Sequence, residues 1–346
     1  MTGASRIVGA AILLGVLVAL TAVPSDAEAA DGDTLITVKA RGVLRCGVSE
    51  GIVGFSSRDA AGQWVGIDVD FCRALAAAAL GDQNKVELIP LKASARFPAL
   101  LTRQIDVLTR NTTWTLLREG ALNVQFAGVL FYDSQAFVVP SLGAPQSIAS
   151  LKGATVCVQK ETSTLDHLIA FSAEHGLDIK PLVMGSANES SNAFFAGRCA
   201  AYTADSSYLN ALRLRAPGGA AAFVILPERI SKEPLGPVVR GDDHAWLTLV
   251  RWVLFTLIAA EEIGVTRENL QTRLRDPLVQ HALVPDGTVT RTIGVEPGWT
   301  LRALQSAGNY GELFERNVGA HSSLGLERGI NSLWTHGGLM YAPPFR

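Results

Sequence analysis

The sequence predicts an α/β protein made of two doubly wound lobes. Short β-branched runs alternate with stretches of helical period, which is the pattern of parallel strands covered by helices. This order of elements starts twice, once before and once after Pro140 and Pro145. At 346 residues, 48% of them hydrophobic, the chain is long enough for two lobes and too apolar for a disordered protein.

The first lobe is expected to be one βαβαβ half of a doubly wound sheet. Asp68 and Ser94 are expected to cap its two helices, and Gly81 to end the first of them. Its strands are expected over 43–48, 86–89 and 105–108.

The second lobe repeats the pattern and interrupts the first. Strands are expected over 155–158, 181–184 and 201–204, helices over 162–175 and 188–196, and the lobe's end near 223–226. A proline-rich connector then leads to a helix over 243–263, whose apolar face needs the first lobe as its partner. Two segments, 135–139 and 234–239, would therefore cross between the lobes. Two crossings make a hinge, and clefts between such lobes are preferred ligand sites.

The N-terminal 29 residues have the layout of a secretory signal peptide. An apolar run over 7–23 follows Arg6, and the small-x-small series ending at Ala29 offers a cleavage site. An uncleaved membrane anchor is the alternative interpretation. The best later apolar run, 252–260, is too short to span, so a soluble exported protein is expected.

The cysteine count suits an oxidising compartment. Cys46, Cys72, Cys157 and Cys199 allow three pairings, and the sequence does not choose among them. Two disulfides are expected, with four buried free thiols as the alternative. No two cysteines have the spacing of a zinc site and the six histidines are scattered, so we expect no metal site.

Charge and motifs exclude several functions. The net charge of −2 gives no reason to expect nucleic acid as a partner. No motif indicates a cofactor. Residues 47–51 match the G-x-S-x-G turn of hydrolases, but that turn needs a helix directly after it, and 52–66 is predicted to be loop.

Polar residues follow the predicted strands where open α/β sheets bind ligands. After the strand at 105–108 come Asn111, Thr113 and then Arg118, whose guanidinium matches a carboxylate. A solvated surface arginine is the alternative. In the second lobe, Asp205 stands at a strand end and Thr162 and Ser163 at a helix start where free backbone N–H groups can bind an anion, and at both places ordinary helix capping is the simpler interpretation.

Several blocks stand in a distinctive order along the chain. They are VLRCGV at 43–48, GIDVDFC at 66–72, 106–118, 197–205, EPLGP at 233–237, GNYGE at 308–312, FERN at 314–317 and YAPPFR at 341–346. Together these blocks resemble the amino-acid-binding periplasmic proteins of ABC transporters, solute-binding protein family 3. The general L-amino-acid-binding subgroup is most similar, and the likeness covers about 34–346.

The resemblance implies a type II periplasmic-binding-protein fold with two hinge crossovers. Lobe 1 would comprise 34–136 and 237–346 with a C-terminal helical tail, and lobe 2 would comprise 137–236. The protein would be a periplasmic monomer that closes on a free L-amino acid, with broad specificity, and delivers it to an inner-membrane ABC permease. An enzyme on the same scaffold and a periplasmic ligand sensor are the alternatives.

The resemblance also assigns roles to residues. Arg118 falls on the family's α-carboxylate anchor and Asp205 on its α-ammonium acceptor. Asn111, Thr113, Thr162 and Ser163 fall on supporting contacts. Candidates for side-chain selectivity are Ser49, Glu50, Ile52 and Phe55.

Placed by the same resemblance, the cysteines pair within lobes, Cys46 with Cys72 and Cys157 with Cys199, which leaves the hinge free. The chain departs from the family pattern at three positions. Glu161 replaces a usual glycine, bringing a carboxylate near the ligand and losing the freedom to take positive φ. Ser134 and Ala136 replace small hinge positions and are expected to stiffen the crossing.

Overall fold

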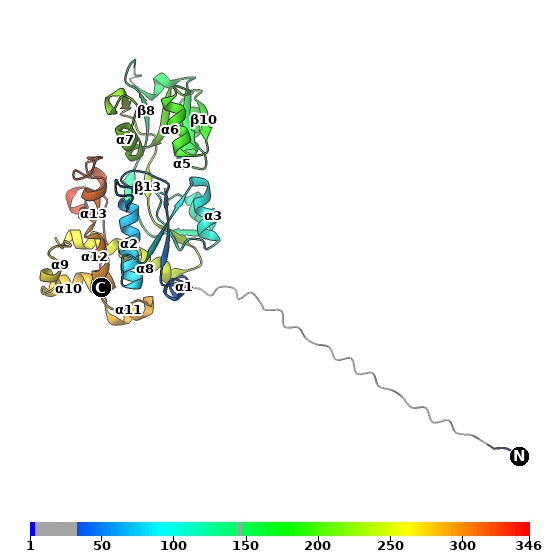
Figure 1. Cartoon of the computed structure of the whole chain (residues 1–346), viewed down its shortest axis with the longest axis vertical. Helices are drawn as coiled ribbons and strands as arrows, with labels where there is room; N and C mark the ends of the chain where they lie inside the picture. The colour runs from blue at the N-terminus through cyan, green and yellow to red at the C-terminus, as the bar shows by residue number, and fades with distance from the viewer. Residues whose placement is uncertain (4–32, 144, 146) are drawn as a thin grey trace. The chain divides into compact units, whose positions relative to one another are not determined.

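The computed structural model describes residues 1–3, 33–143, 145 and 147–346. Its compact unit spans Asp31–Arg346 and contains two central sheets with helices packed around them (Figure 1). The predicted signal segment lies almost entirely outside the described residues.

The first sheet has the strand order β4-β1-β5-β14-β6. Strands β4, β1 and β5 are parallel, and β14 runs antiparallel to both of its neighbours, β5 and β6. The three strands predicted at 43–48, 86–89 and 105–108 are confirmed as β1, β4 and β5. The elements of this part are α1 (Asp33–Arg41), β1 (Leu44–Ser49), β2 (Ser57–Arg58), β3 (Trp64–Val65), α2 (Ile67–Leu80), β4 (Val86–Leu91), η1 (Ala93–Ala95), α3 (Arg96–Leu101), β5 (Val107–Leu108), α4 (Leu116–Leu122) and β6 (Val124–Phe126).

The second sheet repeats this winding with the order β10-β9-β11-β8-β12. Strands β10, β9 and β11 are parallel, and β8 is antiparallel to β11 and β12. The predicted strands and helices of this lobe are all present. Its elements are β8 (Gln135–Pro140), η2 (Ile148–Leu151), β9 (Thr155–Gln159), α5 (Ser163–Glu174), β10 (Lys180–Met184), α6 (Ala187–Phe195), β11 (Ala201–Asp205), α7 (Ser206–Leu214), η3 (Ala220–Ala222) and β12 (Phe223–Ile225).

The chain passes between the sheets as a two-stranded antiparallel ribbon. Strand β7 (Phe131–Asp133) pairs with β13 (Glu233–Leu235), so Asp133 lies opposite Glu233. The crossings predicted at 135–139 and 234–239 are therefore displaced, because all of 135–139 is β8 inside the second sheet and β14 (Val238–Arg240) has already rejoined the first. The exact domain boundaries stay a prediction.

After the ribbon, helices cover the first sheet. Helix α8 is capped by Asp243, whose side chain accepts a hydrogen bond from the Trp246 N–H, and it packs against α2, α12 and α13. Figure 1 shows these helices side by side. The elements that follow the ribbon are α8 (His244–Glu262), α9 (Leu270–Arg273), α10 (Pro277–Leu283), α11 (Gly287–Ile293), α12 (Trp299–Ala307), α13 (Tyr310–Asn317), η4 (Gly329–Asn331) and η5 (Trp334–His336).

Helix α8 corrects one expectation from sequence. By length and composition this 19-residue helix is apolar enough to cross a membrane, although no later stretch was expected to qualify. About 61% of its apolar window is buried inside the protein. A helix buried in the core of a protein is also apolar, so burial accounts for the composition of α8.

The two helix caps predicted in the first lobe are wrong. Helix α2 starts after Gly66, at φ 130°, and Asp68 lies within its first turn. A Cβ at position 66 would lie 2.1 Å from the Phe55 carbonyl oxygen, so the close approach of the backbone sets this start. Ser94 lies inside η1 and caps neither η1 nor α3. Gly81 ends α2 as predicted, in the left-handed conformation.

Both disulfides join elements of the same lobe. Cys46 in β1 is bonded to Cys72 in α2, with Cα atoms 6.2 Å apart, and Cys157 in β9 is bonded to Cys199 just before β11, with Cα atoms 5.6 Å apart. This confirms the expected pairing. Neither bond spans the β7–β13 ribbon.

Candidate functional site

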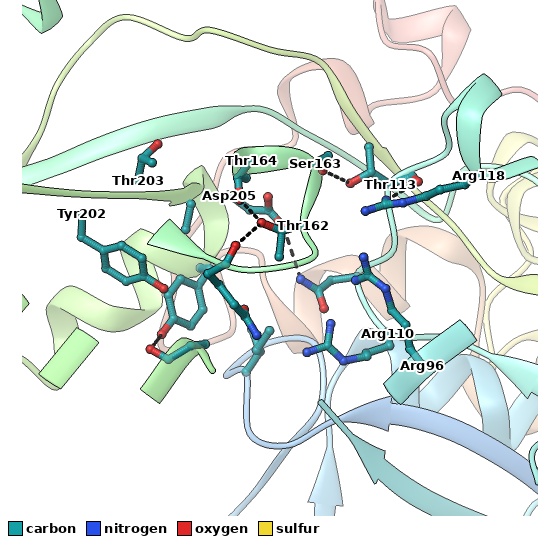
Figure 2. A pocket seen from close by; sticks show the side chains of 16 residues that line it. Arg96, Arg110, Thr113, Arg118, Thr162, Ser163, Thr164, Tyr202, Thr203 and Asp205 are labelled. Atoms are coloured by element: carbon teal, nitrogen blue, oxygen red, sulfur yellow. Dashed lines mark hydrogen bonds between the residues drawn. The ribbon is translucent and has the colours of Figure 1, made fainter. Parts of the chain in front are cut away.

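A pocket lies where the carboxyl ends of the parallel strands of both sheets face one another. Its wall is polar, with apolar side chains contributed mainly by Ile52 and two tyrosines. The lining residues are Ile52, Arg96, Arg110, Asn111, Thr113, Arg118, Gln159, Thr162, Ser163, Thr164, Ala187, Tyr202, Thr203, Ala204, Asp205 and Tyr208. Figure 2 shows the three arginines on one side and Tyr202, Thr203 and Asp205 on the other.

The loop after β5 supplies Asn111 and Thr113. Asn111 takes φ 32°, a conformation that asparagine tolerates better than most residues. Its backbone N–H donates to Asp68 Oδ2 at 3.1 Å. Asp68 therefore holds the pocket loop and does not cap α2. Burial raises the pKa of its carboxyl to about 7, against the opposing effect of that hydrogen bond.

Arg118 reaches the pocket from the first turn of α4. The Thr115 side chain caps this helix by accepting from the Arg118 N–H, and Arg118 Nη1 donates to the Thr113 carbonyl at 2.7 Å. The side chain is half-buried, and burial lowers the pKa of its guanidinium. Arg118 is thus a fixed member of the pocket wall, and the alternative of a freely solvated arginine does not hold.

Asp205 ends β11 and faces the pocket. It occupies the residue before α7, but its side chain makes no capping hydrogen bond there. Its Oδ2 accepts from Asn111 Nδ2 at 3.3 Å. Burial, and then the nearby Asp133 and Glu233, raise the pKa of Asp205 well above its usual value. A cation beside this carboxylate would offset those unfavourable effects.

Thr162 and Ser163 combine capping with a place in the pocket. Thr162 caps α5 by accepting from the Leu165 N–H. Ser163 Oγ donates to Glu233 Oε2 in the crossing ribbon at 3.0 Å, so its oxygen is left to accept from the Thr113 hydroxyl at 3.1 Å. Ser163 therefore links the ribbon to the pocket wall.

Three hydrogen bonds join the two halves of the pocket. Asn111 donates to Asp205, Thr113 pairs with Ser163, and Arg96 Nη2 donates to the carbonyl of Glu161 at 3.3 Å. Each bond links a residue next to the first sheet with one next to the second.

Sequence reasoning missed Arg96 and Arg110. Both are almost fully buried, 3% and 5% exposed, and both line the pocket. Burial lowers the pKa of Arg96 well below its usual value and that of Arg110 to about 10. Arg110 could have been found, because it lies two residues after β5, where doubly wound sheets bind ligands. Arg96, at the start of a helix, gave no comparable signal.

The four candidates for side-chain selectivity lie in different places. Ile52 lines the main pocket and also a smaller one beside it, which Ser49 and Glu50 line as well. Ser49 is buried and bonded to Ser56, whereas Glu50 is exposed. Phe55 lines neither pocket. It is 1% exposed and packs edge-on against Phe131 in the core.

Glu161 corrects one expectation. It does take the positive φ, 58°, that was expected to be lost with the glycine. Its side chain is exposed, lies 3.9 Å from Lys160 Nζ and does not line the pocket, but its charge still acts on Arg96 in the pocket wall.

The arrangement suits a small ligand that carries charges of both signs. Three arginines offer donors to carboxylates, and one buried carboxylate accepts from a cation. Arg96 Nε and Asn111 Oδ1 are buried without a hydrogen-bond partner among the described residues. Such atoms in a pocket wall mark positions for ligand or water.

A model of the bacterial extracellular solute-binding proteins, family 3, matches residues 44–269. The match runs through both sheets and the crossing ribbon, and it covers well over half of the chain. The chain belongs to this family.

Relatives of this solute-binding protein match along nearly their whole length. The glutamate/glutamine/aspartate/asparagine-binding protein BztA of Rhodobacter capsulatus is 46% identical, over 92% of this chain and 95% of that one. The general L-amino acid-binding periplasmic protein AapJ of Rhizobium johnstonii is 42% identical, over 96% and 99%.

Solved structures confirm the type II periplasmic-binding-protein fold. A periplasmic binding protein of an ABC transporter from Brucella ovis, with glutathione bound, superposes with a TM-score of 0.87. It is 41% identical, covering 91% of this chain and 100% of that one. An ancestral arginine-binding protein bound to arginine is 29% identical, with a TM-score of 0.54, over 61% and 90%.

Proposed function

We propose that this protein captures free L-amino acids in the periplasm and delivers them to an ABC permease in the inner membrane. The observation that carries the proposal is the placement of Arg118 and Asp205 on opposite halves of one buried pocket. A zwitterion that leaves water needs both of its charges met, because an unpaired buried charge is costly. Arg118 would receive the α-carboxylate and Asp205 the α-ammonium.

The placement of Arg118 and Asp205 on opposite halves of the pocket also explains how a ligand would close the two lobes. A ligand that bridges Arg118 and Asp205 binds the closed arrangement better than an open one, so it shifts the population toward closure. The ribbon β7–β13 is the hinge in this proposal, and neither disulfide restrains it. Asn111, Thr113, Thr162 and Ser163 would complete the contacts to the ligand.

We also propose that the protein is exported to the periplasm, acts as a monomer with a permease partner, and does not chemically change its ligand. The relatives named as periplasmic or transporter-binding proteins support the periplasm and a permease partner, with residues 1–29 as the signal peptide. One chain supplies both halves of the pocket, which supports a monomer. The ligand would leave unchanged, so mass spectrometry of amino acids incubated with the protein should find no product.

Calorimetric titration tests the proposal directly. The mature protein is unfolded, dialysed and refolded to remove bound ligand, and then titrated with L-amino acids and with matched amines and carboxylates that lack one charge. Binding should require both α-charges. Arg118→Met and Asp205→Asn should each weaken it at least about 30-fold, because each leaves a ligand charge unpaired. The exposed Arg103→Met is the control. A folded protein that binds no amino acid contradicts the proposal.

A further inference from the structure

We propose that Arg110 is a specificity-determining residue that receives a second carboxylate, carried by the side chain of the bound amino acid. The inference deepens the proposed function and rests on it. It assigns acidic L-amino acids as the preferred ligand class, and the smaller pocket beside the main one as the subsite for their side chains.

The two pockets meet at Arg110. Ile52, Arg110, Gln159, Ala187 and Tyr208 line both of them. Arg118 and Asp205 line only the main pocket. A ligand whose α-groups are held by Arg118 and Asp205 would therefore extend its side chain along Arg110 toward the smaller pocket.

The guanidinium of Arg110 is held in place through one nitrogen, and its other hydrogen-bond donors remain for a ligand. Its Nε donates to the carbonyl of Leu91, the last residue of β4, at 2.8 Å. That is its only hydrogen bond to a residue in the described part of the chain. Arg110 is 5% exposed and lines both pockets, so its two terminal nitrogens are open to a ligand or to water there. A planar carboxylate is the group that fits the two terminal nitrogens together.

Charge favours the same ligand class. The main pocket is lined by three arginines and one carboxylate. The α-groups of a zwitterion would pair with Arg118 and Asp205 and add no net charge. Arg96 and Arg110 would then receive no anionic group from that part of the ligand. Arg96 Nη2 donates to the Glu161 carbonyl across the pocket, whereas the one hydrogen bond of the Arg110 guanidinium to a described residue goes to Leu91, beside the first sheet. Glu50, which lines the smaller pocket, and Asp68 and Asp205 exert favourable charge effects on Arg110, but among the described residues none of them is hydrogen-bonded to its guanidinium.

Amino acids with basic, apolar or amide side chains should bind less tightly than acidic ones. A lysine or arginine ligand would bring its cation toward Arg96 and Arg110, and buried like charges repel. An apolar side chain would leave the terminal nitrogens of Arg110 without acceptors. An amide side chain offers one acceptor oxygen and no charge, so glutamine and asparagine should bind with intermediate affinity.

The test compares L-glutamate, L-glutamine and L-leucine in calorimetric titrations of refolded wild-type protein and of Arg110→Met. Wild type should bind glutamate at least about 10-fold more tightly than leucine. Arg110→Met should weaken glutamate binding about 30-fold or more and change leucine binding less than about 3-fold. Arg110→Lys, which keeps the charge but loses the planar donors, should fall between them. The exposed Arg103→Met should match wild type.

The outcomes separate this inference from the proposed function. Wild-type protein that binds none of the three ligands overturns both. Equal binding of glutamate and leucine, or an Arg110→Met variant that weakens all three ligands equally, overturns the role of Arg110 and leaves amino-acid binding intact. If thermal unfolding shows that Arg110→Met is not folded, the ratio of glutamate to leucine affinity in Arg110→Lys decides, and an unchanged ratio overturns the inference.

Discussion

The side chain of Asn331 makes two hydrogen bonds to the backbone of Tyr132. Its Oδ1 accepts from the Tyr132 N–H at 2.7 Å, and its Nδ2 donates to the Tyr132 carbonyl at 2.9 Å. Tyr132 is the middle residue of β7, where it lies opposite Pro234 of β13. Because no strand of the described part of the chain lies along the other edge of β7, Asn331 satisfies backbone groups that would otherwise be unpaired.

This contact predicts a structural role for the C-terminal segment at the crossing. Asn331 is 4% exposed, so Asn331→Ala should leave two backbone groups of Tyr132 poorly satisfied and lower the free energy of unfolding by roughly 1–3 kcal/mol. Urea unfolding measures the change. The neighbouring Ile330 is 51% exposed, and Ile330→Ala serves as the control. Equal stability of the two variants would show that the contact with β7 contributes nothing.

Affinity for amino acids should depend on the ionisation of Asp205. The pKa of its carboxyl is raised by burial and by Asp133 and Glu233, and only the ionised form pairs with an ammonium. Binding should therefore weaken as the pH falls through that raised pKa, by up to about tenfold per pH unit. Dissociation constants measured at several pH values check this, and Asp205→Asn should flatten the profile. A wild-type profile that stays flat down to about pH 4 would contradict the role of Asp205.

Asp68 should make stability fall as the pH rises. Its pKa is about 7 in the folded protein against 3.8 as a reference value, so between these values the folded state binds more protons than the unfolded state. This group should reduce the free energy of unfolding by up to about 1.4 kcal/mol per pH unit over that window. Asp68→Asn keeps an acceptor for the Asn111 N–H, and its unfolding free energy should lose that part of the slope. Unchanged slopes in urea unfolding would refute the assignment.

The disulfides should stabilise each lobe separately. They close segments of 26 and 42 residues, for which chain entropy predicts roughly 3–4 kcal/mol each. Paired replacement, Cys46→Ala with Cys72→Ala or Cys157→Ser with Cys199→Ser, should lower the unfolding free energy by about that amount. Peptide mapping without reduction should recover the two pairs, and a cross-linked peptide from different lobes would contradict the structure.

Much of the fold could be predicted because its signals are local. The β-branched runs and helical periods at β1, α2, β9 and α5 depend on neighbours within one element, and these elements were predicted to within a few residues. The helix caps failed at Asp68 and Ser94, since a cap depends on backbone angles that packing sets. At the start of α2, the Phe55 carbonyl against Gly66 decides those angles.

The sequence by itself determined the order of strands and helices, the two-lobed winding and the presence of Arg118 and Asp205 after strand ends. Only the tertiary structure decided that Arg96 and Arg110 line the same pocket, that Asp68 holds the Asn111 loop, and that Phe55 belongs to the core. It also brought Asn331 to Tyr132, 199 residues away. Burial and long-range contact arise from the packing of distant segments, and no local pattern in the chain encodes them.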